Sequence, residues 1–214
     1  MILSRGRRYI FIHIPKTGGT AMALALESRA MKDDIMLGDT PKARKRRKKV
    51  DPAQASGRLW KHSTLKDLGG IVTPDEMRDF FVFTMVRNPW DRAVSYYHWL
   101  QEQAFDHPAV TLSKSLPFGE FLRHPMTRNG FRNSPSASYV TGPGGENFCN
   151  LFIRLESSDS DADPLWRHLG FRLTLDRVNV SRRRDDYRLY FSDSDAEIIA
   201  LDCAEDIRRF GYSF

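Results

Sequence analysis

Two apolar runs along the chain have the composition of buried strands, and a helical pattern follows each of them. The runs are Tyr9–Ile14 and Phe80–Val86, and both are rich in the aromatic and β-branched residues that favour strands. Residues 20–31 consist largely of helix formers, and apolar side chains recur at helical spacing after Pro89. Strands that alternate with helices predict an α/β fold with a mainly parallel central sheet flanked by helices.

Capping residues mark where further helices begin. Thr73 and Glu76 have the spacing of a capping box with Pro74 as the first helical residue, and Asn88 is placed to cap a helix that begins at Pro89. By contrast, residues 32–58 are polar and residues 105–147 are proline-rich, so both are predicted to be largely irregular. Two further strands are expected, one (or a strand end) at 59–65 and one at 148–156. Helices are expected at 118–123, after the capping residues 157–163 with Trp166 and Leu169 in the helix, and at 193–210.

Length and hydropathy set the class of protein. At 214 residues the chain has the size of one domain, residues 1–214, with a core of its own. No apolar run approaches the ~20 residues that span a bilayer, and the run after the basic N-terminal residues is too short for a signal peptide. We therefore expect a cytoplasmic protein without a transmembrane segment.

The basic character of the chain is local. The net charge is +6, and residues 41–49 carry seven basic side chains and no acidic one, so the rest of the chain has a net charge of −1. Like charges at this density disfavour compact structure, so we predict that the segment is a mobile loop or an exposed helix end and that the 32–58 insertion around it is mobile. The segment could attract nucleic acid, anionic lipid or an acidic polysaccharide, or it could be a solvated charge run without a specific partner.

The turn after the first apolar run has the chemistry of an anion site. Pro15-Lys-Thr-Gly-Gly-Thr20 joins the strand to the helix with one lysine, two hydroxyls and two glycines. Glycines let backbone N–H groups turn toward a ligand, and the helix start adds partial positive charge. An ordinary strand-to-helix turn with a glycine pair is the alternative. A Walker A loop places its lysine after the second glycine, whereas Lys16 precedes both, so that pattern fails.

A second strand-to-helix junction carries a guanidinium and a hydroxyl. Arg87 follows the second apolar run directly, and Ser95 lies in the second turn of the helix after it. Together they form a second candidate anion site, and two such sites suit a ligand with phosphates at both ends. The alternative for Arg87 is a structural ion pair with Asp91 or Glu76.

These two motifs resemble those of the sulfotransferases, most closely the carbohydrate-type (family 2) group with its P-loop-like fold. Pro15–Thr20 is similar to the family's 5′-phosphosulfate loop, and Val86–Ser95 is similar to its 3′-phosphate motif. The resemblance also covers the stretch around Asn179-Val-Ser181 and the C-terminal residues 204–214, but carries little of 32–58 and 105–147.

The resemblance implies a donor, 3′-phosphoadenosine 5′-phosphosulfate, and residues that bind it. The 5′-phosphosulfate would be held by Lys16, Thr17, Gly18, Gly19, Thr20 and Ala21. The 3′-phosphate would be held by Arg87 and Ser95. An arginine among 182–184, assigned to Arg182, would close over the nucleotide together with Asn179 and Ser181.

The implied reaction is transfer of a sulfuryl group to an acceptor hydroxyl, expected to belong to a carbohydrate, with 3′-phosphoadenosine 5′-phosphate as product. Such an in-line transfer depends on positioning and electrostatic stabilisation, for which Lys16 is the first candidate. His62 is the preferred general base, because it follows the polar insertion at a position where related enzymes are expected to carry a histidine or carboxylate. His13 and Glu156 are the other candidates.

Two further functions remain open at this point. An ATP-dependent small-molecule kinase would share the phosphate chemistry, but the position of Lys16 argues against it. A non-catalytic nucleic-acid-binding module could use residues 41–49, but it leaves both anion motifs unexplained, and no specific nucleic-acid partner is expected. No cluster of residues has metal-ligand spacing, so no metal is expected. Neither the acceptor nor the oligomeric state can be read from the sequence.

Overall fold

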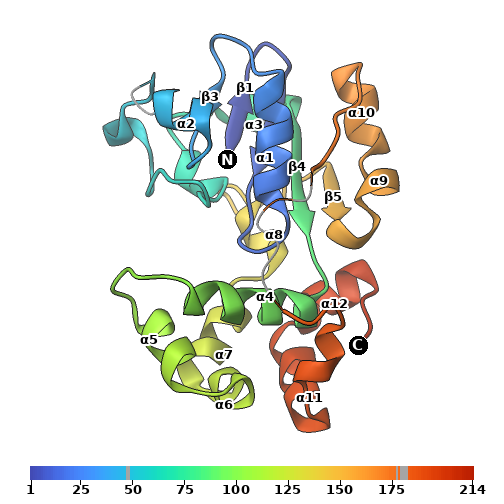
Figure 1. The fold of residues 1–214 in the computed structure, drawn as a ribbon. Helices are drawn as coiled ribbons and strands as arrows, with labels where there is room; N and C mark the ends of the chain where they lie inside the picture. Colours follow the sequence, from blue (N-terminus) through green and yellow to red (C-terminus); the bar gives the residue numbers. More distant parts are fainter. Residues whose placement is uncertain (47–48, 177, 179–182) are drawn as a thin grey trace. The chain divides into compact units, whose positions relative to one another are not determined.

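The computed structural model describes residues 1–46, 49–176, 178 and 183–214, and the chain divides into two compact units. The first, which we call the sheet unit, comprises Met1–Val86 and Ser136–Val178. The second, the helical unit, comprises Arg87–Pro135 and Asn179–Phe214. Figure 1 shows the strands and the long helix α1 in the sheet unit, and only helices and connecting segments in the described part of the helical unit.

The sheet unit is built on a five-stranded sheet with the order β3-β1-β2-β4-β5. The strand β4 pairs in parallel with β2 on one side and with β5 on the other, and Tyr9 of β2 lies opposite Phe81 of β4. The strand β1, however, pairs antiparallel with both β2 and β3. The strand bounds are Ile2–Ser4 (β1), Tyr9–Ile12 (β2), Ile35–Met36 (β3), Phe81–Val86 (β4) and Leu151–Arg154 (β5).

The α/β class is therefore confirmed, but the sheet is mixed rather than mainly parallel. The physical reason lies in the short link between β1 and β2, where Arg8 adopts a left-handed φ of 53°. A turn this short can join only antiparallel neighbours, because a parallel pair needs a crossover of a dozen or more residues. The three-residue strand β1 lies before the first predicted strand and was not expected.

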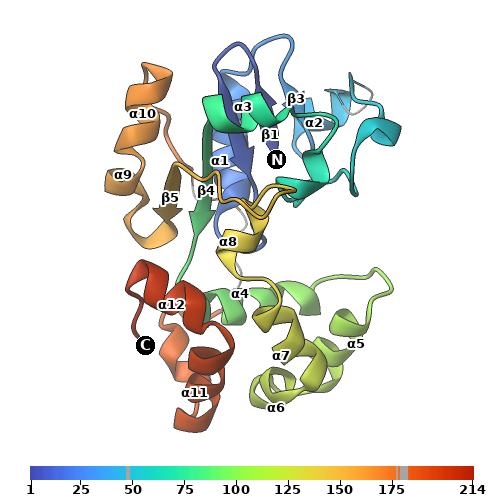
Figure 2. The same ribbon diagram turned by 180° about the vertical axis from the view of Figure 1, so that it is seen from behind.

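Alternate residues of the central strands enter two separate cores, one on each face of the sheet. Helix α1 (Gly19–Ser28) covers one face and helix α3 (Pro74–Asp79) the other, as the two opposite views show (Figures 1 and 2). The strand residues on the α1 side are Ile2, Tyr9, Phe11, Phe83 and Met85, and those on the α3 side are Leu3, Ile10, Ile12 and Val82. Side chains of the run Phe80–Val86 enter both cores, which confirms the prediction that this run forms a buried strand.

The polar segment 32–58 has more structure than predicted. Ile35 and Met36 form the edge strand β3, and Pro41–Arg46 form helix α2, whose Ala43 is buried. The apolar side chains Met36 and Ala43, which pack into the core, could not be recognised among the polar residues of this segment.

Residues 59–65 form turns rather than the predicted strand. The Ser63 hydroxyl accepts from the Trp60 N–H at 2.8 Å and lies 2.9 Å from the carbonyls of Arg58 and Trp60, which stabilises the turn. The Thr73–Glu76 capping box at the start of α3 is present as predicted.

The helical unit corrects the prediction for residues 105–135, which are the part of the 105–147 segment that it contains. Pro108 and Pro125 are the first residues of helices, and Pro117 caps another, so the prolines begin helices rather than break them. The predicted helix at 193–210 is divided near Cys203. The helices of this unit are α4 (Pro89–Gln101), α5 (Pro108–Ser115), α6 (Phe118–Arg123), α7 (Pro125–Arg132), η5 (Tyr187–Tyr190), α11 (Asp193–Asp202) and α12 (Ala204–Phe210).

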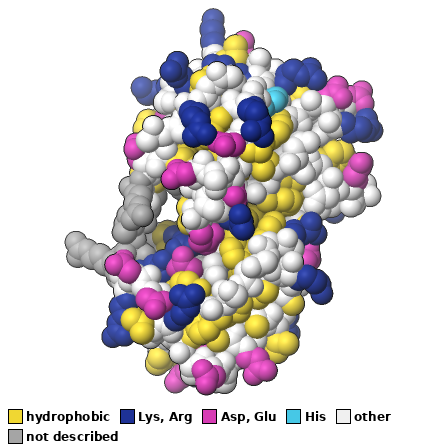
Figure 3. Space-filling model, turned by 90° about the vertical axis from the view of Figure 1, so that its right-hand side faces the viewer, with side chains coloured by type: hydrophobic (Ala, Val, Ile, Leu, Met, Phe, Trp, Pro, Cys, Tyr) yellow, Lys and Arg dark blue, Asp and Glu magenta, His cyan; other side chains and the backbone are white. Residues whose placement is uncertain are grey.

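The described part of the sheet unit also contains several short helices. They are η2 (Pro52–Gln54), η3 (Lys66–Leu68), α8 (Ser136–Tyr139), η4 (Leu155–Ser157), α9 (Ser158–Asp161) and α10 (Asp163–Leu169). Of the helices the structure describes, none is long and apolar enough to cross a bilayer. The described residues also contain no group of three or more His, Cys, Asp and Glu side chains that could hold a metal ion. Basic and acidic side chains are interspersed on the face shown in Figure 3.

Candidate functional site

The turn between β2 and α1 forms a tight loop, with two residues in the left-handed backbone region. Gly18 has φ of 83°, which is unstrained for glycine, but Lys16 has φ of 67°, which is rare for a residue with a side chain. Holding a lysine there raises the free energy by about 1–3 kcal/mol, so the surrounding structure must impose this conformation. The Thr17 side chain is buried, and its hydroxyl donates to the Ile14 carbonyl at 2.9 Å, which closes the loop on itself.

Both glycines of the loop are enclosed by side chains from the sheet. A Cβ atom on Gly18 would lie 2.6 Å from Cδ1 of Leu155, and a Cβ atom on Gly19 would overlap the His13 ring. The backbone of the loop therefore packs directly against the residues that follow β5 and β2. Glycine is needed at these positions for steric reasons as well as for the φ of Gly18.

Helix α1 begins immediately after this loop with an uncapped N-terminus. Gly18 is the N-cap residue and offers no side chain, and the first turn contains no acidic residue. The N–H groups of Ala21 and Met22 both point to the Gly18 carbonyl, at 3.0 and 3.5 Å. The first N–H groups, those of Gly19 and Thr20, have no acceptor within the helix. With Lys16 beside them, these groups form a positive site suited to a phosphate or sulfate.

His62 forms a hydrogen bond with His13, the first residue after β2. Its Nδ1 lies 2.7 Å from the His13 carbonyl oxygen, and the two imidazole rings meet edge to face at 4.6 Å between centroids. A carbonyl only accepts, so Nδ1 of His62 carries the proton and Nε2 of the neutral ring holds a lone pair. The sequence separation of 49 residues makes this contact a product of the fold.

Both histidines are neutral near pH 7. Burial lowers the pKa of His62 to about 4; the hydrogen bond to the His13 carbonyl raises it, and the Lys61 ammonium lowers it further. Burial, followed by the charges of His62 and nearby cations, lowers the pKa of His13 well below its usual range. His13 is only 7% exposed and fills the space beside Gly19, which gives it a clear packing role.

A second cluster of charges lies at the start of α4 in the helical unit. Nη2 and Nε of Arg87 lie 2.6 and 2.7 Å from Oδ2 of Asp91, and Nη2 of Arg183 lies 2.5 Å from Oδ1 of the same carboxylate. The three side chains are 12–16% exposed. Two guanidiniums on one carboxylate leave a net charge of +1. Nη1 of Arg183 is buried without a hydrogen-bond partner among the described residues, so the cluster can accept a further anion.

Asn88 holds this junction in place. Its Oδ1 accepts from the Trp90 N–H at 3.1 Å, as predicted for a helix cap, and its Nδ2 donates to the Tyr187 hydroxyl and to the Ser213 carbonyl. Ser95 lies one turn beyond Asp91 on α4 and is buried. The ion pair of Arg87 with Asp91 is the structural alternative recognised in the sequence, whereas Glu76 pairs with Arg5 instead.

Comparison with known proteins supplies the family. The model of the family described as "Sulfotransferase family" matches residues 1–135, well over half of the chain. The chain belongs to the sulfotransferase family. A search of curated proteins finds no match. Among solved structures, this chain is similar to the crystal structure of mouse sulfotransferase SULT7A1 complexed with PAP. The sequence identity is 15% and the TM-score is 0.46, and the match covers 94% of this chain and 83% of the mouse chain.

The part of this sulfotransferase that matches the family contains most of the predicted site residues. In the sheet unit the structure brings together Lys16, the two glycines, His13 and His62. In the helical unit it places Arg87 beside Asp91 on the helix that carries Ser95. Asn179, Ser181 and Arg182, which were also predicted to bind the nucleotide, lie outside the described residues.

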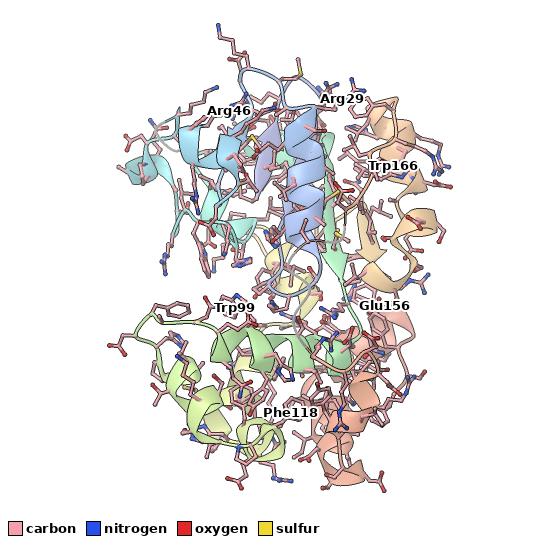
Figure 4. All side chains as sticks on the ribbon, in the orientation of Figure 1. Arg29, Arg46, Trp99, Phe118, Glu156 and Trp166 are labelled. Carbon is pink, nitrogen blue, oxygen red and sulfur yellow. The ribbon has the colours of Figure 1, made fainter. Side chains whose placement is uncertain are left out.

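The other candidate base, Glu156, lies in η4 directly after β5 (Figure 4). The arginine beside it, Arg154, pairs with Asp161 at 2.8 Å.

Sequence reasoning did not single out Arg183 from its two arginine neighbours. The three consecutive arginines 182–184 are equivalent by composition, and only the contact with Asp91, 92 positions earlier, distinguishes Arg183. The arginine run itself was the available signal. The local sequence does not predict which of the three arginines contacts helix α4.

Proposed function

We propose that this sulfotransferase transfers the sulfuryl group of 3′-phosphoadenosine 5′-phosphosulfate to a hydroxyl of a carbohydrate acceptor, with His62 as the general base. The observation that carries the proposal is the loop before α1. Lys16 is held there in a left-handed conformation beside a helix N-terminus that has neither a capping side chain nor an acidic residue in its first turn.

The loop supports the proposal because its fixed donors match the charge that develops during transfer. The attacking hydroxyl oxygen forms a bond to sulfur while the bond from sulfur to the 5′-phosphate oxygen breaks. Negative charge then grows on the leaving phosphate. The Lys16 ammonium and the N–H groups of Gly19 and Thr20 would stabilise that charge, and the rigid packing of the loop means that they need little reorganisation.

His62 supports the proton transfer in the same step. With Nδ1 fixed on the His13 carbonyl, Nε2 would take the proton that the acceptor hydroxyl loses. A pKa of about 4 makes His62 a weak base in the protein alone. The negative charge of the donor would raise this pKa toward neutrality, because a nearby anion stabilises the imidazolium form. The base would thus strengthen once the donor is bound.

The charge cluster at α4 supports recognition of the 3′-phosphate. Arg87 and Arg183 share one carboxylate, so the pair retains a positive charge for an incoming phosphate, and Ser95 adds a hydroxyl on the same helix. Arg183 would add a second guanidinium to the 3′-phosphate site, for which the sequence had predicted only Arg87 and Ser95; the arginine predicted to close over the nucleotide was Arg182. ATP lacks the 3′-phosphate, so this cluster would favour the proposed donor over ATP.

The proposal is tested by the thermal stability of the protein with three ligands. At ~100 times its dissociation constant, 3′-phosphoadenosine 5′-phosphate should stabilise the fold by about 2.7 kcal/mol. ATP and a short oligonucleotide at the same concentration should do so by much less. Stabilisation by ATP without stabilisation by the bisphosphate would favour a kinase and overturn the proposal, and stabilisation by the oligonucleotide alone would favour a nucleic-acid-binding module.

A further inference from the structure

The sheet unit carries a group of cations at the end that lies away from the loop before α1. The loop follows the carboxyl end of β2 and leads into α1, whereas the link at residues 5–8 precedes β2 and residues 29–34 follow α1. The ten residues of α1 separate these two ends by about 15 Å. Arg29 and Arg46 both lie at the end away from the loop, as Figure 4 shows. The basic run at 41–49, which the proposed function does not use, therefore reaches this end of the sheet unit.

Two arginines of this group are anchored by one aromatic ring. The guanidiniums of Arg7 and Arg29 lie over the Phe171 ring, at 4.9 and 5.5 Å from its centroid, and Nη2 of Arg7 donates to the Arg29 carbonyl at 3.2 Å. Nε2 of His168 lies 2.9 Å from the Arg7 carbonyl, which ties the end of α10 to the same place. Neither guanidinium forms an ion pair with a residue that the structure describes. Their charges are thus held in position without being neutralised.

The basic run adds two cations beside the turn that follows α1. Arg46 Nη1 donates to the Met31 carbonyl at 2.7 Å, and the Lys49 ammonium donates to the Lys32 carbonyl. We call the five cations together the basic end of the sheet unit; they are Arg7, Arg29, Lys32, Arg46 and Lys49. Two carboxylates lie in the same turn, those of Asp33 and Asp34, and the second is buried and accepts from the Met31 N–H at 2.8 Å. The basic end therefore has a net charge of about +3.

An exposed apolar side chain lies among these cations. Met31 is 40% exposed, and its Sδ would lie 2.5 Å from a Cβ atom on Gly6, so its side chain lies over the link between β1 and β2. An apolar tip surrounded by lysine and arginine is the composition of a membrane contact, where the tip enters the headgroup region and the cations pair with lipid phosphates. Single-stranded nucleic acid instead needs aromatic faces for its bases. The half-buried Phe171 ring is already stacked with two guanidiniums, which disfavours that partner.

We propose that the basic end docks the protein on the surface of a membrane that contains anionic lipids, with Met31 in the headgroup region. The charge of the surface is complementary to that of an anionic leaflet, and each cation close to such a leaflet strengthens binding roughly fivefold. Because the loop before α1 lies at the other end of β2 and α1, docking in this way would not cover it. The proposal concerns a different surface from the donor site and does not depend on the function proposed above.

Co-sedimentation of the full chain with lipid vesicles tests the proposal. Vesicles of phosphatidylcholine with about one third phosphatidylglycerol should bind at least about tenfold more tightly than vesicles of phosphatidylcholine alone. Raising the salt from ~0.1 to ~0.5 M should weaken this binding at least about fivefold, because salt screens exposed charges. A short single-stranded DNA, compared at equal phosphate concentration, should bind more weakly than the anionic vesicles. Equal binding of the two kinds of vesicle would overturn the proposal, and tighter binding of the DNA would assign the surface to nucleic acid instead.

Variants at exposed positions locate the contact. Lys32→Glu should weaken binding to the anionic vesicles about tenfold, whereas Lys66→Glu, the same change at an exposed position in η3, should leave it within about twofold of the wild type. Met31→Ser should weaken binding about threefold, and Leu189→Ser, at an exposed apolar position of the helical unit, should not change it.

Thermal unfolding of each variant serves as the folding control. Wild-type vesicle binding in both Lys32→Glu and Met31→Ser, or an equal loss in Lys32→Glu and Lys66→Glu, would overturn the proposal. If a variant does not fold, the salt dependence and the lipid preference of the wild type still decide whether an anionic surface is the partner.

Discussion

The loop before α1 and the cluster at the start of α4 follow the same strand-to-helix plan but handle positive charge differently. The loop has a lysine, backbone N–H groups and no acidic residue in the first helical turn. The α4 junction has a side-chain cap, Asn88, and an acidic residue, Asp91, that two arginines share. The first turn of α1 thus carries no carboxylate that would offset the partial positive charge of its N-terminus, whereas the first turn of α4 carries one that is already paired with two arginines.

This difference fits the two tasks that we propose. A site where charge changes during the reaction benefits from fixed N–H donors at a helix N-terminus without an acidic residue in its first turn, because such donors act most strongly on the transition state. A site that only recognises a static phosphate can share its cations with a carboxylate. That carboxylate also stabilises the arginines when no ligand is present.

Removal of Lys16 should have the largest effect. We expect Lys16→Ala to lower kcat/KM at least 100-fold, because loss of one fixed donor to a developing anion typically reduces the rate by ~10²–10³. Release of 3′-phosphoadenosine 5′-phosphate from the donor, with a carbohydrate acceptor present, measures the rate. Lys66→Ala, an exposed lysine in η3, is the matched control and should keep wild-type activity. Equal activity in the two variants would contradict the role of the loop.

Acid should destabilise the sheet unit through the histidine pair beside this loop. The pKa of His62 is about 4 in the folded protein and about 6.5 when unfolded, so below pH 6.5 the unfolded chain binds a proton that the folded chain does not. The free energy of unfolding should therefore fall as the pH drops from 6.5 toward 4, by up to about 3 kcal/mol for His62. Burial of His13 acts in the same direction.

Urea unfolding at several pH values measures this slope. His62→Asn should flatten it between pH 6.5 and 4.5, while Lys66→Ala should leave it as in the wild type. A slope that is the same in His62→Asn and the wild type would show that the ring pair does not titrate as described.

A methyl group on Gly19 tests the packing that makes the loop rigid. The added Cβ would overlap the His13 ring, and Gly19→Ala should lower the free energy of unfolding by about 1–3 kcal/mol. Gly144→Ala is the control, because a Cβ there would have no neighbour within 4 Å and its φ is not positive. Chemical denaturation compares the two. If both variants are equally stable, the loop is more tolerant than its contacts indicate.

The smallest expected effect is at the α4 cluster. Asp91→Asn leaves Arg87 and Arg183 without their shared counter-ion and should lower the free energy of unfolding by about 1–2 kcal/mol. Bound 3′-phosphoadenosine 5′-phosphate should recover part of that loss, since a phosphate can replace the missing charge. Asp75→Asn, which removes an exposed ion pair with Arg78, should change stability by less than ~0.5 kcal/mol. A loss that the bisphosphate does not reduce would mean that the cluster is purely structural.

The sequence predicted those features of the fold that depend on local signals. The capping box at Thr73 and Glu76, the cap at Asn88 and the buried strand β4 are each encoded within a few residues, and all three are present. The prolines of 105–147 were misread because a proline is equally compatible with a helix start and a loop. Only the burial of helices such as α5 and α6 in a shared core decides between the two.

Features that depend on distant contacts could not be predicted. The three-residue strand β1 is too short to carry a periodic signal and is defined by its pairing with β2 and β3. The contact of His62 with His13 and that of Arg183 with Asp91 join residues 49 and 92 positions apart. The residue types at the candidate site were visible in the sequence, but the partners that orient them are set by tertiary packing.

The most direct test of the central claim is a crystal structure of the protein with bound 3′-phosphoadenosine 5′-phosphate. We predict that the 5′-phosphate oxygens lie within hydrogen-bond distance of Lys16 Nζ and of the N–H groups of Gly19 and Thr20. A 5′-phosphate bound elsewhere, with the loop before α1 making no contact to it, would contradict the account.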